Sequence, residues 1–510
     1  MEEKINRLYC FPANLLAFLF LLTACTGRIP AIPNTVSPTV TPNPNNSTSP
    51  TPFGPLENTP TTPPNNPEIT ATKSPGLTST QSPPPVFSPP LYSLNARMDY
   101  AAHSLTVDES IFYQNATGET LTGLILAVEP NLWADCFRLG GLMVNNRAVT
   151  EISLKGDRLE VPLAPPLLPD GNLTLSLQFG LHLPAADSYH VFGYNSRQVN
   201  LVDWFPFIVP YSGGWLLHPP AEVGEHLTYD TATFDVTLSL ADVTLPVTLA
   251  ASAPAEVTGG RWHYRLQNAR TFVFSASTSY QAASTKIGDV MVSSYYFAQE
   301  EVQAKTVLEE TVRALTTFSA LFGRYPYKSL SIVEALFFDG LEYDGLFFLS
   351  RDFYKASNGT VLNNLIDIAV HETAHQWWFG QVGNDQALDP WLDEALATYS
   401  EKLFYEKNYP DVTAWWTFRV TTFAPTGWVD MDIYHGRNFR TYADAVYLRG
   451  AQFLEALRRR IGEEAFFAFL KDYSAQMAGK RATPADFFRI LNDHTSIDLS
   501  DIISIYFQHF

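Results

Sequence analysis

The chain has 510 residues, of which 46% are hydrophobic and 17% are charged, and its formal net charge is −19. A negative surface of this kind favours solubility and repels phosphate groups, so no nucleic acid is expected among the partners. The acidity itself carries no information about a particular substrate.

The first 24 residues are predicted to be a secretion signal. A weakly basic start is followed by the apolar run 15–22, which is too short to span a bilayer as a helix. Leu22-Thr23-Ala24-Cys25 resembles the bacterial lipobox, in which the cysteine becomes the lipid-modified first residue. The resemblance implies a lipid anchor at Cys25 and an extracytoplasmic protein on a bacterial cell membrane. An uncleaved membrane anchor is the alternative, and it also places the remaining chain outside the cytoplasm.

Residues 25–90 are predicted to be a disordered linker rich in Pro, Thr and Ser. The stretch after Cys25 holds 18 of the 36 prolines and only four charged residues, so it cannot bury a core. Removal of the signal and lipidation of Cys25 would leave Cys136 as the one remaining cysteine. No disulfide framework is then possible within a chain, and Cys136 is expected to be a small buried apolar residue.

Residues 91–285 are predicted to form a β-rich N-terminal domain. Apolar and polar residues partly alternate over several short segments separated by turn residues, which is typical of an antiparallel sheet with one buried face. The expected strands lie within 101–128, 173–179, 233–240, 243–250 and 271–276.

Residues 286–510 change to a helical period and are predicted to form the second domain. A strand is expected at 330–338 between helices, and Asp389 and Pro390 are expected as the N-cap and first-turn proline of a helix. The other expected helices are 299–322, 361–378, 447–460, 463–473 and 483–492.

The helix 361–378 contains His371-Glu372-Thr373-Ala374-His375, which reads HExxH. A helix places the two histidines one turn apart on the same face, beside a carboxylate. The residues before this motif are strongly apolar, so burying its polar side chains without a partner would be costly. Zinc would remove that cost for the histidines, and Glu372 would act as a general base on water.

Glu394 is predicted to be the third metal ligand. It lies nineteen positions after His375 on a second helix, between apolar neighbours. Two histidines and one carboxylate hold zinc and leave its fourth position open for water. An exposed helix carboxylate is the alternative reading of Glu394. Thr398 or Asp393 is expected to orient a ligating histidine, and the residues alone do not decide between them.

The motif and the segment Trp391-Leu392-Asp393-Glu394-Ala395 resemble the aminopeptidase-N-like zinc metallopeptidases, the gluzincins with HExxH, eighteen residues and then Glu. This resemblance implies an α+β multidomain protein with an N-terminal antiparallel β-sheet saddle and a thermolysin-like α/β catalytic domain. It also implies one zinc ion held by His371, His375 and Glu394, with peptides carrying a free N-terminus as substrates. The C-terminal helical domain of larger members is expected to be absent.

Two further segments resemble this family. The segment 339–345 is similar to its Gly-Ala-Met-Glu-Asn motif, which implies that Glu342 binds the free α-amino group. This chain departs from the motif at four positions around that glutamate. Tyr447-Leu448-Arg449-Gly450-Ala451 resembles the family's Tyr-x-Lys-Gly-Ala segment, which implies that Tyr447 stabilises the oxyanion. Tyr442 is the rival tyrosine, and His435 is expected to be structural or at the rim.

The function expected from the sequence is therefore that of a zinc-dependent aminopeptidase at the cell surface. An endopeptidase or another zinc hydrolase with the same core is the alternative that the departures around Glu342 leave open. A non-catalytic surface binding lipoprotein is the second alternative, although Glu372 and Tyr447 are both present. The aromatic stretches 203–206 and 211–215 are expected either to line the cleft or to pack at the domain junction.

Overall fold

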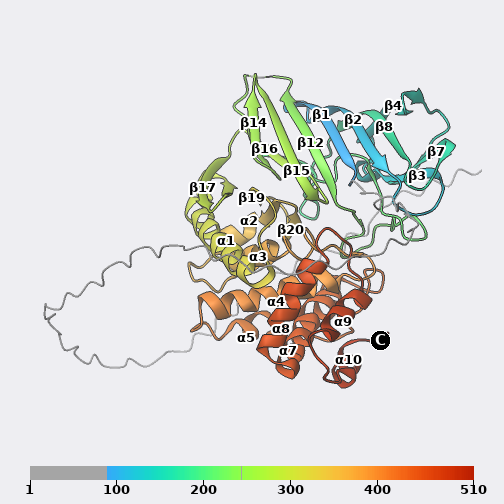
Figure 1. Ribbon diagram of the computed structural model, residues 1–510. Helices are drawn as coiled ribbons and strands as arrows, with labels where there is room; N and C mark the ends of the chain where they lie inside the picture. Colours follow the sequence, from blue (N-terminus) through green and yellow to red (C-terminus); the bar gives the residue numbers. More distant parts are fainter. Residues whose placement is uncertain (1–88, 243, 510) are drawn as a thin grey trace, which may run out of the picture. The chain divides into compact units, whose positions relative to one another are not determined.

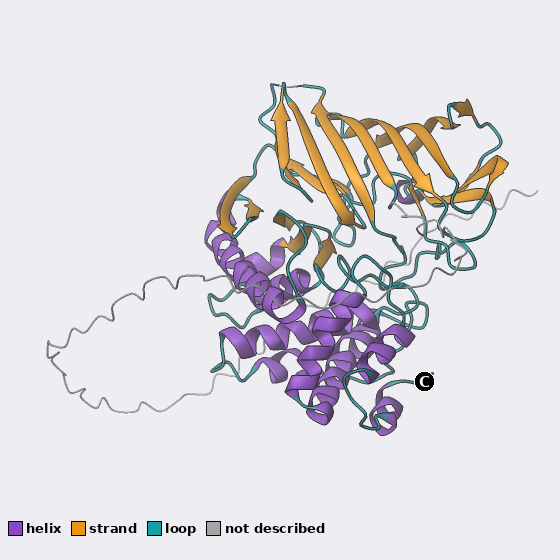
Figure 2. Ribbon diagram, viewed as in Figure 1, coloured by secondary structure: helices purple, strands orange, loops and turns teal. Residues whose placement is uncertain are grey.

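The computed structural model describes residues 89–242 and 244–509 of the chain. Cys25, the signal and nearly all of the linker expected from the sequence lie outside the described residues. The described part is built of strands in its first half, then a small mixed sheet, then helices (Figures 1 and 2). None of the helices within 89–242 and 244–509 is long and apolar enough to cross a bilayer.

The first half is organised around a wide, twisted sheet. Its strands alternate between buried and exposed side chains, as β2 shows with Leu105, Val107, Ile111 and Tyr113 on the inner face. In spatial order the sheet contains β14 (Ala255–Thr258), β15 (Arg261–Ala269), β12 (Ala232–Leu240), β1 (Leu91–Asp99), β2 (Ser104–Gln114), β8 (Asn172–His182), β4 (Phe137–Val144) and β5 (Arg147–Ala148).

This sheet is not purely antiparallel, which corrects the expectation from the sequence. β1 pairs with β12 in parallel, although the chain between these two strands also contributes β2, β4, β5 and β8 to the same sheet. Two small sheets complete the first half. They contain β11 (Phe207–Ile208), β3 (Leu121–Ala127), β7 (Arg158–Leu167) and β6 (Ser153–Lys155), and β13 (Thr248–Ala251), β16 (Phe274–Ser277), β10 (Val199–Leu201) and β9 (Gly193–Tyr194).

The core of this half is dense in aromatic side chains. Trp204 is fully buried and its indole N–H donates to the carbonyl of Phe272 at 3.0 Å. Phe205 packs edge-on against it, so this aromatic stretch serves packing rather than the cleft. Cys136 is buried, as expected.

A five-stranded mixed sheet begins the second half. β19 and β21 are buried along their whole length and lie parallel to each other. Residue 285, the expected domain boundary, falls within β17, which pairs with β18 of this sheet. In spatial order the sheet contains β17 (Gln281–Ile287), β18 (Val290–Tyr296), β19 (Ser329–Ala335), β21 (Leu346–Ser350) and β20 (Gly340–Tyr343).

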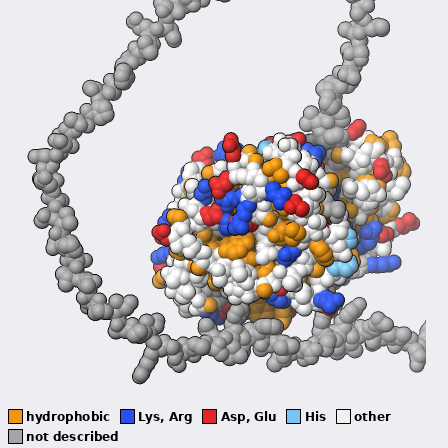
Figure 3. Space-filling view, turned by 90° about the horizontal axis from the view of Figure 1, so that it is seen from below, with side chains coloured by type: hydrophobic (Ala, Val, Ile, Leu, Met, Phe, Trp, Pro, Cys, Tyr) orange, Lys and Arg blue, Asp and Glu red, His pale blue; other side chains and the backbone are white. Residues whose placement is uncertain are grey.

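The helices follow and accompany this sheet. α3 and α4 lie beside each other beneath β20 (Figure 1). On the face seen in Figure 3, Lys and Arg side chains lie next to Asp and Glu. Ion pairs such as Arg460 with Asp501 link neighbouring helices. The helices of four turns or more are α1 (Glu301–Phe322) and α4 (Trp391–Asn408), and the shorter ones are α2 (Arg351–Ala356), α3 (Asn364–Ala374), α5 (Trp415–Arg419), α6 (Phe439–Ala443), α7 (Gly450–Ile461), α8 (Glu463–Gln476), α9 (Pro484–Asn492) and α10 (Ser500–Tyr506).

Candidate metal centre

Helix α3 positions the HExxH residues. The side chain of Asn363 caps it by accepting from the N–H groups of Leu365 and Ile366, which fixes the start of the helix. α3 ends at Ala374, one turn earlier than the sequence predicted, and His375 stands at its C-cap. The two histidines still lie one turn apart on the same face, since the backbone N–H of His375 donates to the carbonyl of His371.

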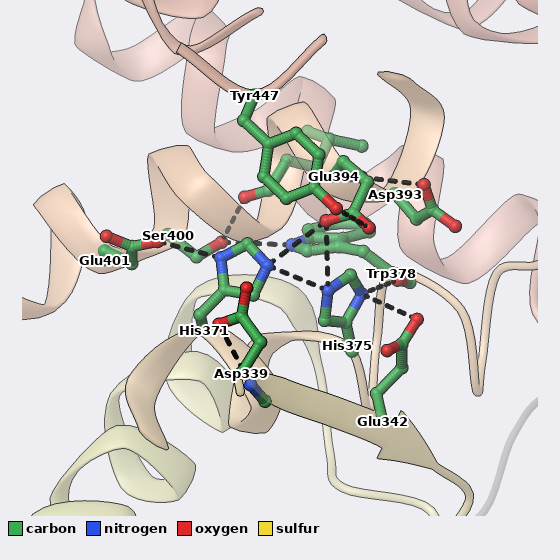
Figure 4. A network of polar contacts seen from close by, with 12 residues as sticks. Asp339, Glu342, His371, His375, Trp378, Asp393, Glu394, Ser400, Glu401 and Tyr447 are labelled. Carbon is green, nitrogen blue, oxygen red and sulfur yellow. Dashed lines mark hydrogen bonds and ion pairs between the residues drawn. The ribbon is translucent and has the colours of Figure 1, made fainter. Parts of the chain in front are cut away.

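His371, His375 and Glu394 converge on one point (Figure 4). The Nε2 atoms of the two histidines lie 3.0 Å apart, and Oε2 of Glu394 lies 3.2 Å from His371 Nε2 and 3.4 Å from His375 Nε2. All three side chains are buried. The structure therefore brings together the three ligands that the sequence predicted, with α3 supplying two and α4 the third.

Each histidine is oriented through its other ring nitrogen. His371 Nδ1 lies 2.8 Å from Oε1 of Glu401, and His375 Nδ1 lies 2.9 Å from the carbonyl of Trp378. Both acceptors fix a proton on Nδ1 and leave Nε2 free to bind a metal. Arg419 holds the Glu401 carboxylate in turn, at 2.8 and 3.1 Å.

The orienting residues differ from those that the sequence predicted. The hydroxyl of Thr398 is buried without a hydrogen-bond partner, and Asp393 accepts only from the N–H of Glu394. Glu401 was missed, although it lies seven residues after Glu394 on the same face of α4. α4 itself begins at Trp391 with Pro390 as N-cap, one residue later than expected, and Asp389 lies outside it.

The donor set fits a zinc ion. Two imidazole nitrogens and one carboxylate oxygen, all turned toward one another and within 3.0–3.4 Å, have no reason to converge without a cation between them. Burial disfavours the charged form of His371, but hydrogen bonds to Glu394 and Glu401 outweigh it and raise its pKa to about 9. His371, His375 and Glu394 are therefore the residues that would hold a zinc ion.

Glu372 lies beside the donor set and is free for proton transfer. It is 4% exposed, and its Oε2 has no hydrogen-bond partner. Its carboxylate lies within 4.8 Å of ligand atoms of Glu342 and His375. Burial raises its pKa well above the usual value, although the two histidines lower it. Gly340 makes room for Glu372, because a Cβ at that position would lie 2.0 Å from its Oε1.

Tyr447 lies over the donor set from the other side. Its ring stacks on His371 at 5.9 Å and its hydroxyl donates to Oε1 of Glu394 at 2.5 Å (Figure 4). It belongs to a π-helical stretch, Asp444–Arg449, rather than to the α-helix that the sequence predicted. Such wide turns occur at functional sites, where they redirect a side chain. Tyr442 packs against Gly224 instead, and His435 is largely exposed and pairs with Asp432.

A cluster of carboxylates flanks the donor set on the β20 side. Glu342 is 5% exposed, and its Oε1 lies 3.9 Å from His375 Nδ1 and 3.5 Å from the amide nitrogen of Gln386. The same amide nitrogen also donates to Glu225. Burial, and then the charge of Glu342, raise the pKa of Glu225 well above its usual value. A pocket of about 600 Å³ opens at these residues.

Sequence reasoning missed Glu225. It lies in an irregular segment of the first half of the chain, far from Glu342 in the sequence, and no spacing rule joins the two. The buried Glu342 and the half-buried Glu225 share one amide donor and have spare acceptor capacity for a cationic group. The cluster can therefore hold an ammonium group beside the metal site.

Gln376 links the segment that carries the histidine ligands to the strand that carries Glu342. Its amide nitrogen donates to the carbonyl of Tyr343 at 2.9 Å, and its amide oxygen accepts from the N–H of Gly345 at 3.0 Å. The residue directly after the HExxH motif thus holds the end of the strand that carries Glu342.

Residues 306–506 match the Peptidase family M1 domain. This part of the chain is a peptidase family M1 domain. The M1 domain contains the three ligands together with Glu342, Glu372 and Tyr447, whereas Glu225 comes from the chain before it.

Curated relatives of this M1 domain are distant. Aminopeptidase M1-D of Oryza sativa subsp. japonica is 26% identical over 208 residues, which are 38% of this chain and 24% of that protein. Aminopeptidase N of Lactococcus lactis subsp. lactis is 25% identical over 153 residues, which are 28% of this chain and 18% of that protein. The matches thus span a quarter or less of the length of these relatives.

Solved structures extend the likeness beyond the M1 domain. An M1 zinc metallopeptidase of Deinococcus radiodurans aligns with a TM-score of 0.62 and 19% identity over 82% of this chain and 92% of that one. A mutant of that enzyme bound to Tyr-Ser-Ala aligns with a TM-score of 0.60 over 82% and 93%. This likeness confirms the predicted fold class, a β-rich region followed by the catalytic domain.

Proposed function

We propose that the protein is a zinc-dependent aminopeptidase that removes N-terminal residues from peptides. The observation that carries this proposal is the pair of carboxylates beside the three convergent ligands, the buried Glu342 and the half-buried Glu225, which share one amide donor. A general zinc hydrolase has no use for a cluster of negative charge next to its metal. A substrate with a positive amino terminus does, because the ammonium group compensates the buried charge.

The residues of the centre divide the chemistry among them. Glu342 and Glu225 accept hydrogen bonds from the substrate's ammonium group and set the first peptide bond against the ligands. Zinc, when bound, polarises the carbonyl and acidifies water. Glu372 takes the proton from the attacking water and delivers it to the departing amine, which its raised pKa suits. Tyr447 donates a hydrogen bond from its hydroxyl to the developing oxyanion.

The test compares amino-acid arylamides with their N-acetylated forms. We expect cleavage of the free-amine substrate only, loss of kcat in Glu372→Gln, and a rise in KM in Glu342→Ala with zinc content unchanged. Equal cleavage of the acetylated form would assign an endopeptidase instead. Bound zinc without hydrolysis of either form would assign a binding protein.

We also propose that the protein is held on the outer face of a bacterial membrane by a lipid on Cys25. Only the sequence supports this proposal, through the apolar run 15–22 and the residues that precede the cysteine. Metabolic labelling with a radioactive fatty acid tests it. Incorporation that disappears in Cys25→Ser supports the anchor, and equal incorporation in both forms contradicts it.

A further inference from the structure

Three side chains from distant parts of the first half of the chain meet outside the catalytic centre. Glu129 follows β3, Asp157 lies in the turn between β6 and β7, and His226 belongs to the irregular segment 220–231. One ligand atom of each lies within 4.8 Å of the other two. His226 Nε2 lies 3.2 Å from Oε2 of Glu129.

Asp157 supplies an independent observation that points to a cation at this cluster. It is 9% exposed, and its Oδ2 is buried without any hydrogen-bond partner. A buried carboxylate oxygen without a partner is costly unless a cation compensates it. The backbone keeps it in place, because the N–H of Val128, next to Glu129, donates to the carbonyl of Asp157 at 2.6 Å. β3 and β7, the strands that hold this corner, lie side by side (Figure 1).

A protonated His226 accounts for only part of this arrangement. It would neutralise Glu129, with which it shares a hydrogen bond, and would leave Oδ2 of Asp157 without a donor. A metal ion satisfies all three side chains at once, since each of them can turn a lone pair toward the same point.

We propose that Glu129, Asp157 and His226 bind a second divalent metal ion of the zinc type, outside the catalytic centre. One imidazole nitrogen and two carboxylate oxygens suit zinc or manganese, whereas calcium prefers oxygen ligands alone. The ion joins segment 220–231 to the strands of the first half. Because Glu225 precedes His226, this ion also fixes the residue that lies against Gln386 and the amine-binding cluster.

Metal content of the full-length chain tests the site without any measure of peptide cleavage. After loading with zinc chloride and gel filtration, mass spectrometry should find two zinc ions per chain in the wild type. His375→Ala should keep one of them, and the double variant His375→Ala with Asp157→Asn should keep none. A single zinc ion in the wild type that is lost in His375→Ala, or an unchanged count when Asp157→Asn is added, would overturn the proposal.

A matched control separates this site from an ordinary histidine–carboxylate pair. His218 lies 2.9 Å from Asp385 and is buried to a similar degree, with no third ligand beside it among the described residues. We expect His218→Gln to keep two zinc ions and His226→Gln to keep one.

Thermal unfolding shows whether each variant is folded and gives a second measure of metal binding. In the His375→Ala background, zinc chloride alone should raise the melting temperature, because a ligand that binds only the folded state stabilises it. The rise should disappear when His226→Gln is added. An equal rise in both proteins would overturn the proposal, and the result is independent of whether the catalytic centre cleaves peptides.

Discussion

The carboxylate of Glu401 lies 2.8 Å from Nδ1 of His371, and two hydrogen bonds from Arg419 hold it there. Burial disfavours its charge, but Arg419 and His371 keep the pKa of Glu401 below its usual value. The carboxylate is therefore charged, accepts a hydrogen bond from Nδ1–H of His371 and leaves Nε2 of His371 as a metal ligand.

Glu401→Gln should weaken zinc binding at the catalytic centre by about 10- to 100-fold, the usual effect of removing the group behind a ligating histidine. The amide no longer stabilises a protonated Nδ1. Competition with a zinc chelator measures the affinity. Thr398→Val is the control on the same helix, because the Thr398 hydroxyl has no partner. Equal affinities in Glu401→Gln and the wild type would contradict the assigned role.

Gly340→Ala should lower kcat on amino-acid arylamides by about 10²-fold, in the range that general base catalysis contributes. The new methyl group would lie 2.0 Å from Oε1 of Glu372, so this flexible carboxylate must turn away. Zinc content should stay unchanged. Gly141→Ala is the matched control, because no atom lies within 4 Å of its added Cβ and its φ is not positive. A fully active Gly340→Ala would show that Glu372 acts from another position.

Tyr447→Phe should lower kcat by about 10²- to 10³-fold with little change in KM, since its hydroxyl acts on the transition state. Steady-state kinetics on one arylamide measure both constants. Tyr442→Phe is the control, because the Tyr442 hydroxyl lies against Gly224, whereas the Tyr447 hydroxyl donates to Glu394. A greater loss of kcat in Tyr442→Phe would reverse the assignment of the two tyrosines.

The stability of the protein should depend on pH through Glu334, a fully buried carboxyl in β19. Burial raises its pKa from 4.5 to about 7, although the N–H of Phe297 and the charge of Arg351 act against it. The folded state thus binds this proton more tightly, and its stabilising contribution, complete below pH 4.5, is lost as the pH rises to about 7.

Glu334→Gln has no such titration and isolates the effect. The free energy of unfolding of the wild type, relative to this variant, should fall by about 3 kcal/mol between pH 4 and pH 8. Urea unfolding at several pH values measures the difference. Glu256→Gln, at an exposed position of β14, should show no comparable change. A relative stability that rises with pH would mean that Glu334 is charged in the folded state.

Local patterns predicted the three ligands, because the two histidines lie one turn apart on α3 and Glu394 lies between apolar neighbours on α4. The change from alternating to helical periodicity predicted the order of the two halves. Glu401 was also within reach of that reasoning, since it repeats the face of Glu394 two turns later. Glu225 and the parallel pairing of β1 with β12 were not, because both depend on how segments far apart in the chain come together. The π-helical turn at Tyr447 could not be predicted from the sequence either, since packing against α4 rather than a local sequence pattern selects it.

The two hydrogen bonds that Gln376 forms at the end of β20 fix the distance between the amine-binding residue and the metal ligands of the proposed enzyme. Oε1 of Glu342 lies 3.9 Å from Nδ1 of His375, on the same ring as the ligating Nε2, and an extended residue spans about 3.3 to 3.6 Å of chain. One residue fills the space between the amine anchor and the ligands, and two do not fit. Helix and strand cannot slide past each other while Gln376 joins them, so each binding event should release a single amino acid and never a dipeptide.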